Sequence, residues 1–259
     1  MVQAEIAEDR LNFNAPAALT LDGTGDTASM PSSNNFGING TDAGGCGATT
    51  TNPAVPAIGV GSAADVTTVA GAIPNGRKNN YTGSGSPPNP DVEDDSSSLP
   101  TNLQSVSSLQ ALVSTVKANV TQPVITGPAT NIANAGTLAN PQIIYVNGDL
   151  TLTGAVTGYG MIVVTGTFTA SGNVGWNGLV LVVGKGNFVG SGGGGNVYNG
   201  AILVAKTVDS MGNPLASIGA PTFNFAGGGG NGFNYASGCI DAVNKLSTFH
   251  IMAFREMLN

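Results

Sequence analysis

The densest group of side chains that could bind a cation is acidic. Asp91, Glu93, Asp94 and Asp95 fall within one short segment. Hard cations such as Ca²⁺ take clustered carboxylates as ligands, which makes these four residues candidate Ca²⁺ ligands. Their spacing does not follow the EF-hand loop, and Pro, Gly and Ser surround them. We therefore favour a solvated acidic loop over a metal site and predict no cofactor.

Cysteine and histidine offer little further chemistry. The two cysteines, Cys46 and Cys239, do not form a CxxC pair, and His250 is the single histidine. This set cannot supply a zinc cluster of ordinary ligand spacing. The cysteines form either a long-range disulfide or two free, buried thiols. His250 lies in an apolar run without an obvious partner, so we interpret it as a structural residue.

Charges are almost absent from the segment 141–205, where only Asp149 and Lys185 carry one. Glycoside cleavage needs two carboxyl groups in one cleft, and this segment has one. The chain also lacks the GxSxG elbow, the Walker A motif and the HExxH motif. We predict a protein that is not an enzyme, with no catalytic residues.

The composition indicates strands and tight turns. Gly accounts for 39 of 259 residues, and only 9% of the chain is charged. This makeup is typical of many short strands joined by turns. With a net charge of -7 and eight basic residues, the chain does not have the clustered positive charge that binds nucleic acid. No apolar run is long enough to span a membrane.

A six-residue repeat supplies the fold prediction. Two apolar residues two positions apart point to the same side of a strand, and a glycine two positions later can turn a corner. Val156 or Ile162 begins such a hexad. Three hexads would make one rung of a triangular tube of about 18 residues, stacked through parallel ladders. The glycines in strict register are Gly148, Gly154, Gly160, Gly166, Gly172, Gly178, Gly184 and Gly190.

We therefore predict a mainly β, single-stranded triangular parallel β-helix (β-solenoid) with a small two-helix insertion. The pattern does not fix the handedness of the coil, and we predict a right-handed one. Rung alignment places the segment 184–190 over 166–172, and the register slips through the glycine run 192–195. Trp176 is expected in the core.

Segments outside the repeat complete this domain. ALTLDG (18–23) and NFGING (35–40) repeat the apolar-x-apolar-x-Gly pattern and are expected to extend the solenoid at one end. Ser62 and Ser105 are expected to start two amphipathic helices that pack on its side or end. The predicted parts are a helical stub after a removed or absent anchor helix (1–14), added rungs (15–58), a helical insertion with an acidic Pro-Gly-Ser loop (59–140), the solenoid core (141–206), and C-terminal rungs with a cap (207–259).

The segment QIIYVNGDLTLTGAVTGYGMIVVTGTFTASGNVGWNGLVLVVGKGN (142–187), followed by GAILVAKT (200–207), resembles the C-terminal region of bacterial PilX-like type IV pilus-associated proteins. FNAPAALTLDG (13–23) and GGGGNGFNYASGCIDA (227–242) also fit that family. The resemblance implies a minor pilin or accessory protein at the cell surface. It carries no catalytic residues. The extracytoplasmic setting that it implies favours a Cys46–Cys239 disulfide.

Three functions follow as hypotheses. The first is a secreted or cell-surface structural or adhesive protein that partners other pilus or surface proteins. The second is a β-helix that binds or cleaves carbohydrate. The third is a self-polymerising scaffold of the bactofilin type, since the ends of a solenoid can stack.

Overall fold

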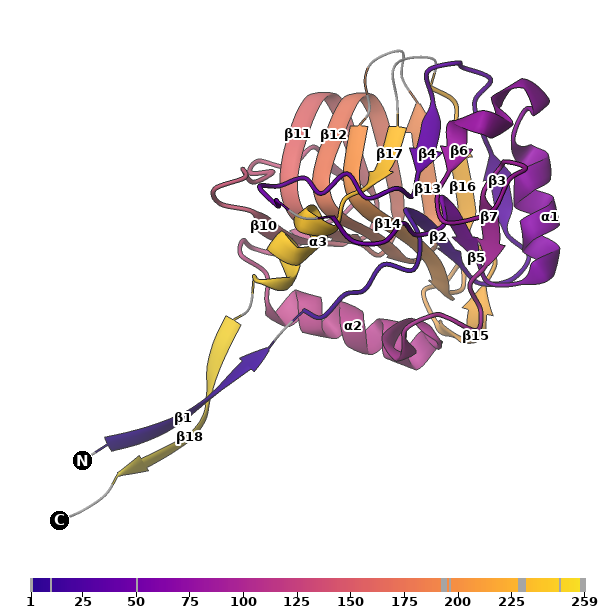
Figure 1. Cartoon of the computed structure of the whole chain (residues 1–259). Helices are drawn as coiled ribbons and strands as arrows, with labels where there is room; N and C mark the ends of the chain where they lie inside the picture. The colour runs from indigo at the N-terminus through magenta and orange to yellow at the C-terminus, as the bar shows by residue number, and fades with distance from the viewer. Residues whose placement is uncertain are drawn as a thin grey trace.

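The computed structural model describes residues 2–9, 11–49, 51–191, 195, 197–227, 232–246 and 248–256, the first and last of these ranges by their backbone only. Over these residues sixteen strands form one sheet, and two more form a separate ribbon (Figure 1). The large sheet is almost entirely parallel and curls round on itself, with three α-helices outside it. The prediction of a mainly β chain with parallel pairing is confirmed.

The six-residue repeat determines the register of the central strands. Leu150 pairs with Phe168 and Val164 with Val182, so the chain returns beside itself after 18 residues. The same spacing pairs Gln142 with Gly160. The strands involved are β10 (Gln142–Asn147), β11 (Leu150–Val164) and β12 (Thr167–Gly184).

The parallel pairs fall into three rows, here called ladders A, B and C. A long strand such as β12 contributes a different part to each ladder, because it bends at its glycines. Ladder A contains β10, 160–164, 178–184, 200–206, β2 (Leu19–Asp22), β5 (Ile58–Val60) and β7 (Val92–Asp94). Ladder B contains β9 (Ala129–Thr130), 150–153, 167–171, β13 (Asn187–Ser191), β16 (Thr222–Phe225) and β3 (Thr27–Ser29). Ladder C contains 154–159, 172–177, 197–199, β17 (Gly232–Tyr235), β4 (Gly37–Asn39) and β6 (Tyr81–Thr82).

The N-terminal strands lie beyond the C-terminal ones. Leu19 pairs with Ile202, and Thr27 pairs with Thr222. Strand β5 then pairs with β2, β7 with β5, and β6 with β4. The segment 18–40 therefore extends the sheet as expected, whereas the segment 59–140 contributes strands as well as helices. The remaining strands of the large sheet are β8 (Ile125–Thr126), β14 (Val197–Val208) and β15 (Pro214–Gly219).

Helix α2 (Val106–Ala118) connects the two ends of the sheet. The helix follows β7, the last of the N-terminal strands, and precedes β8, which pairs with β10 at the other end of the sheet. Ser105 caps it through a capping box with Ser108, in keeping with the predicted start. Thirteen residues at 1.5 Å per residue span about 20 Å, or roughly four strand spacings. The helix contacts ladder A strands along this path.

Both sides of ladder A are buried. Leu179, Leu181 and Val183 alternate with Val180 and Val182, and all five are at most 2% exposed. A strand covered on both faces is apolar at every position, which explains the runs MIVV (161–164) and LVLVV (179–183). Helix α2 and helix α3 (Ser237–Asn244) both contact this ladder from outside.

Most of the glycines in register turn corners. Gly166 has no left-handed φ, but a Cβ there would lie 2.1 Å from Asp149 Oδ1. Its lack of a side chain therefore allows two neighbouring turns of the chain to approach. Six of the eight predicted glycines do have a positive φ: Gly148, Gly154, Gly160, Gly172, Gly178 and Gly184.

The predicted alignment of 184–190 over 166–172 is wrong. Phe168 pairs with Phe188, a spacing of 20 residues, because Lys185 and Gly186 are inserted at the corner. Gly190 thus faces Ala170 inside a strand and continues the six-residue period by coincidence. The glycine run 192–195, where the slip was expected, lies mostly outside the described residues.

The chain ends form a ribbon that projects away from the large sheet (Figure 1). Strand β1 (Val2–Asp9) pairs antiparallel with β18 (Thr248–Glu256). The helical stub expected at 1–14 is therefore wrong, because its residues pair with a segment from the other end of the chain. Alternation of polar and apolar residues in VQAEIAED suits a strand.

Helix α1 (Ala63–Ala72) begins after Ser62, as predicted, and contacts β3, β5 and β7. Trp176 is 1% exposed and donates its Nε1–H to the carbonyl of Gly160 at 3.0 Å. It belongs to the core, as expected. Two short 3-10 helices complete the described elements: η1 (Asn75–Asn80) and η2 (Thr101–Leu103).

Candidate functional site

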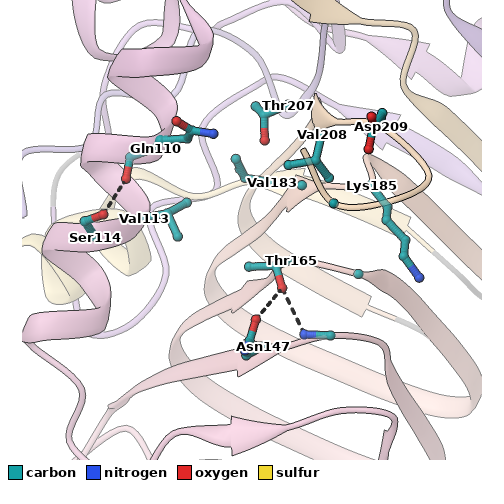
Figure 2. Close-up of a pocket in the computed structure, with 14 residues that line it drawn as sticks. Gln110, Val113, Ser114, Asn147, Thr165, Val183, Lys185, Thr207, Val208 and Asp209 are labelled. Atoms are coloured by element: carbon teal, nitrogen blue, oxygen red, sulfur yellow. Dashed lines mark hydrogen bonds between the residues drawn. The ribbon is translucent and has the colours of Figure 1, made fainter. Parts of the chain in front are cut away.

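A cleft lies between α2 and the corner that joins ladder A to ladder B (Figure 2). Its volume is about 480 Å³. Three successive turns of the chain meet at this corner, and the loop after β14 closes one side. The lining residues are Gln110, Val113, Ser114, Asn147, Gly148, Thr165, Gly166, Val183, Gly184, Lys185, Thr207, Val208, Asp209 and Gly212.

Two hydroxyl groups of the cleft, those of Thr165 and Ser114, bind neighbouring protein atoms. Thr165 Oγ1 accepts the backbone N–H of Gly148 at 2.9 Å and lies 3.4 Å from Asn147 Oδ1 (Figure 2). Ser114 donates its hydroxyl to the carbonyl of Gln110 at 2.8 Å, within the helix. Neither hydroxyl has a histidine or carboxylate base beside it among the described residues, so neither is an activated nucleophile.

The two charges in the central repeat form an ion pair near the cleft. Lys185 Nζ lies 3.1 Å from Asp149 Oδ1, and their side chains are 47% and 43% exposed. The backbone N–H of Thr167 and the Lys185 ammonium hold the pKa of Asp149 below its ordinary value. The two-residue insertion at 185–186 places Lys185 at this corner. Because the pair is half exposed, it contributes little to stability.

The remaining charged group, Asp209, stabilises its own turn. Its Oδ1 accepts the backbone N–H groups of Met211 and Asn213 at 2.8 and 2.9 Å. The floor of the cleft is apolar, with Val113, Val183 and Val208. The arrangement suits a small polar ligand held by exposed amides and Lys185.

The four acidic candidates stay close together but make different contacts. Asp91 and Glu93 lie side by side. Burial raises the pKa of Glu93, and the charge of Asp91 raises it further. Asp91 Oδ2 accepts the backbone N–H of Ala57, and Asp94 Oδ1 accepts that of Ser96. Asp95 is buried, and its backbone N–H binds the carbonyl of Val60. Within the described ranges, no three acidic, cysteine or histidine side chains are arranged to hold a metal ion.

A second group of carboxylates was missed by the sequence reasoning. Asp22, Asp26 and Asp65 are each 3% exposed. Asp65 accepts the backbone N–H groups of Gly25 and Asp26, so it is satisfied. Both oxygens of Asp26 and Oδ2 of Asp22 have no hydrogen-bond partner.

Burial perturbs three of these acids strongly. It raises the pKa of Asp22, Asp26 and Asp95 from 3.8 to about 7. The charges of Asp65 and then Asp22 add to the effect at Asp26. Each group is therefore a protonated acid over most of the acidic range. The only sequence signal was an Asp within an otherwise apolar strand pattern, at Asp22.

Cys46 and Cys239 are joined by a disulfide with a Cα–Cα distance of 4.8 Å. The bridge fixes the loop after β4 to α3 across 193 residues of sequence. Asp42 supports the same junction by accepting the backbone N–H groups of Gly44 and Ser237. Burial opposes ionisation of Asp42, yet these and further hydrogen bonds lower its pKa. The side chain of His250 lies outside the described residues.

No helix in the described part of the chain combines the length and apolar character needed to cross a bilayer. Comparison with protein-family models, curated proteins and solved structures finds no match to this chain.

Proposed function

We propose that this chain is a non-catalytic structural or adhesive protein of the cell surface, associated with type IV pili as a PilX-like minor or accessory component. Its partners would be other pilus or surface proteins. The architecture proposed for this role is a single triangular, right-handed parallel β-helix.

The three ladders support the triangular coil. Each passage of the chain through A, B and C takes 18 residues in the central repeat, and glycines separate the three parts. Such a coil presents long, regular outer faces with few loops. A regular outer face suits repeated weak contacts with an extended partner better than it suits a catalytic centre.

The Cys46–Cys239 disulfide is the main support for a location outside the cytoplasm. Disulfides persist in oxidising compartments and are rare in the cytosol. This one joins two segments that are far apart in sequence and that meet only in the folded sheet. A bridge of that kind supports a protein that folds outside the cytoplasm.

The cleft supports a non-catalytic role. The hydroxyls of Ser114 and Thr165 bind backbone groups, and Asp149 is paired with Lys185. A general base needs a free acceptor within reach of the proton that it takes. None of the lining residues supplies such an acceptor beside a nucleophile.

The test is localisation in the producing bacterium. Intact cells are treated with protease, and sheared pili are separated from cell bodies before immunoblotting with an antibody to this chain. We expect a protease-sensitive, oxidised protein in the sheared fraction. A reduced, protected protein in the cytoplasm, with a cytoplasmic enzyme as the marker, would overturn the proposal.

A further inference from the structure

Ladder B differs from the other two ladders in what it shows to solvent. Its inward side chains, such as Phe168 and Phe188, are fully buried. Its outward residues alternate with these and are partly or fully exposed. The main contacts of β13 and β16 in the described chain are with other strands, and α1 packs on β3 at one end of this ladder. Ladder A, by contrast, is covered by α2 and α3.

The outward residues form three columns of small, uncharged side chains, here called the hydroxyl face. Pairing between strands aligns their members in rows, which lie about 4.8 Å apart as in any sheet. These columns contain no aromatic ring, and only Val189 is apolar. Asp149 lies beside Thr167 at the edge of the face, and its charge is paired with Lys185. The columns are Thr167, Asn187, Thr222 and Thr27; Thr130, Thr151, Thr169, Val189, Asn224 and Ser29; and Thr153, Ser171 and Ser191.

Several of these hydroxyls are not hydrogen-bonded within the part of the chain that the structure describes. Thr151, Thr169 and Thr222 make no side-chain hydrogen bond to any described residue, whereas Thr153 bonds to Asn131. On ladder C the outward amides bond to each other instead. Asn199 donates to Asn177 at 2.9 Å, and Asn234 donates to Asn199 at 3.2 Å. The hydroxyl face therefore offers free donors and acceptors in a repeating pattern.

We infer that the hydroxyl face binds a neutral, insoluble polysaccharide. The inference rests on the proposed adhesive role and names its substrate class. The face has no net charge, because its one acidic neighbour, Asp149, is paired with Lys185. Together with the chain's net charge of -7, this disfavours anionic polymers. Hydroxyl and amide groups both donate and accept, as sugar hydroxyls do. The row spacing is comparable with the advance of one sugar along an extended glycan.

The chemistry also predicts which carbohydrates fail to bind. Each new hydrogen bond replaces one to water, so its net contribution is small. Without an aromatic platform, one or two sugars gain too little to remain bound. A long, rigid chain engages many rows at once, and its second and later contacts are intramolecular. Retention should therefore require a polymer.

The experiment measures retention of the full chain on microcrystalline cellulose and on chitin, with soluble oligosaccharides as competitors. The variant Thr151→Val/Thr169→Val/Thr222→Val removes three hydroxyls but keeps β-branched side chains. Thr157→Val, on exposed ladder C, is the matched control. We expect retention of the wild type and the control, at least about tenfold weaker retention of the triple variant, and no competition by oligosaccharides.

Unfolding midpoints and circular dichroism establish that the triple variant is folded. If the wild type is not retained on either solid, or if the triple variant is retained equally, the inference is wrong. Ice-affinity partitioning is a separate arm, because ice is also a rigid array of hydroxyl groups. Enrichment in ice without retention on polysaccharide would also overturn the inference. None of these results depends on where the protein is located in the cell. Failure of the polysaccharide inference can therefore be distinguished from failure of the proposed cell-surface role.

Discussion

The ring of Trp176 occupies the space in which a side chain of Gly158 would lie. The two residues are paired across β11 and β12, and a Cβ on Gly158 would come within 1.8 Å of the indole ring. Gly158 has no left-handed φ, so its role is to leave room rather than to turn. Gly190 and Phe225 repeat this relationship on ladder B, at 2.0 Å.

Gly158→Ala should lower the free energy of unfolding by about 1–3 kcal/mol, since it overpacks a close-packed core. Chemical denaturation measures the change. Gly175→Ala is the control on the same ladder, because its nearest contact would be 3.3 Å away. If the cost arises from the indole, Gly158→Ala should cost less in a Trp176→Leu background. Equal costs in the two backgrounds would contradict this account.

Removal of the disulfide should destabilise the protein by about 2–4 kcal/mol, because the bridge closes a long loop in the unfolded chain. Thermal unfolding of the wild type with and without reductant measures the loss. The double variant Cys46→Ser/Cys239→Ser should match the reduced wild type and should not respond to reductant. A double variant as stable as the oxidised protein would show that the bridge adds nothing.

Stability should decrease as the pH rises from about 4 to about 7. The folded state holds the pKa of Asp22, Asp26 and Asp95 near 7, while the unfolded chain releases these protons near 3.8. Over that range the folded state binds more protons, so deprotonation favours unfolding. Stabilisation by these protons is complete below the unfolded pKa and is lost above the folded one.

Asp26→Asn tests this dependence at one site. The amide cannot ionise, so the variant should unfold at a higher temperature than the wild type at pH 8, with little or no gain at pH 4. Differential scanning fluorimetry across that range gives both midpoints. Asp94→Asn, at an exposed position, is the control. A gain of the same size at both pH values would refute ionisation as the cause.

Lys185→Met should change the free energy of unfolding by less than about 1 kcal/mol. Its partner Asp149 is 43% exposed and keeps the backbone N–H of Thr167 as a donor. Exposed pairs are screened by salt and cost side-chain entropy. Urea denaturation at low and high salt measures the effect. A loss of several kcal/mol would indicate that Lys185 has a structural role within the corner.

Parallel pairing in the central repeat could be predicted because its signals are local. The spacing of Gly160 and Gly178, with Ile162 and Val180 beside them, places each turn on the next. Helix starts at Ser62 and Ser105 depend on a cap and an apolar stripe, which are also local. The insertion at 185–186 was hidden because Gly184 and Gly190 kept the six-residue period by coincidence.

The remaining features depend on contacts between distant segments. Nothing near Leu19 indicates that it pairs with Ile202, or that β1 pairs with β18. The covering of ladder A did leave a signal, because runs such as LVLVV are apolar at every position. The cleft depends on the path of α2 and could not be placed without it. The hydroxyl face was readable as alternate Thr and Ser residues in 167–171, once the register of its strands was known.

The placement of β2 beside β14 affects the order in which the chain can fold. During synthesis the segment 19–39 emerges well before residues 202–234, which are its partners on one edge. Until then this edge of the early strands stays open and can pair with other chains. Pairing between segments so far apart in sequence is slow. Aggregation during expression, and any dependence on chaperones, should therefore arise from the unpaired edges of β2, β3 and β4.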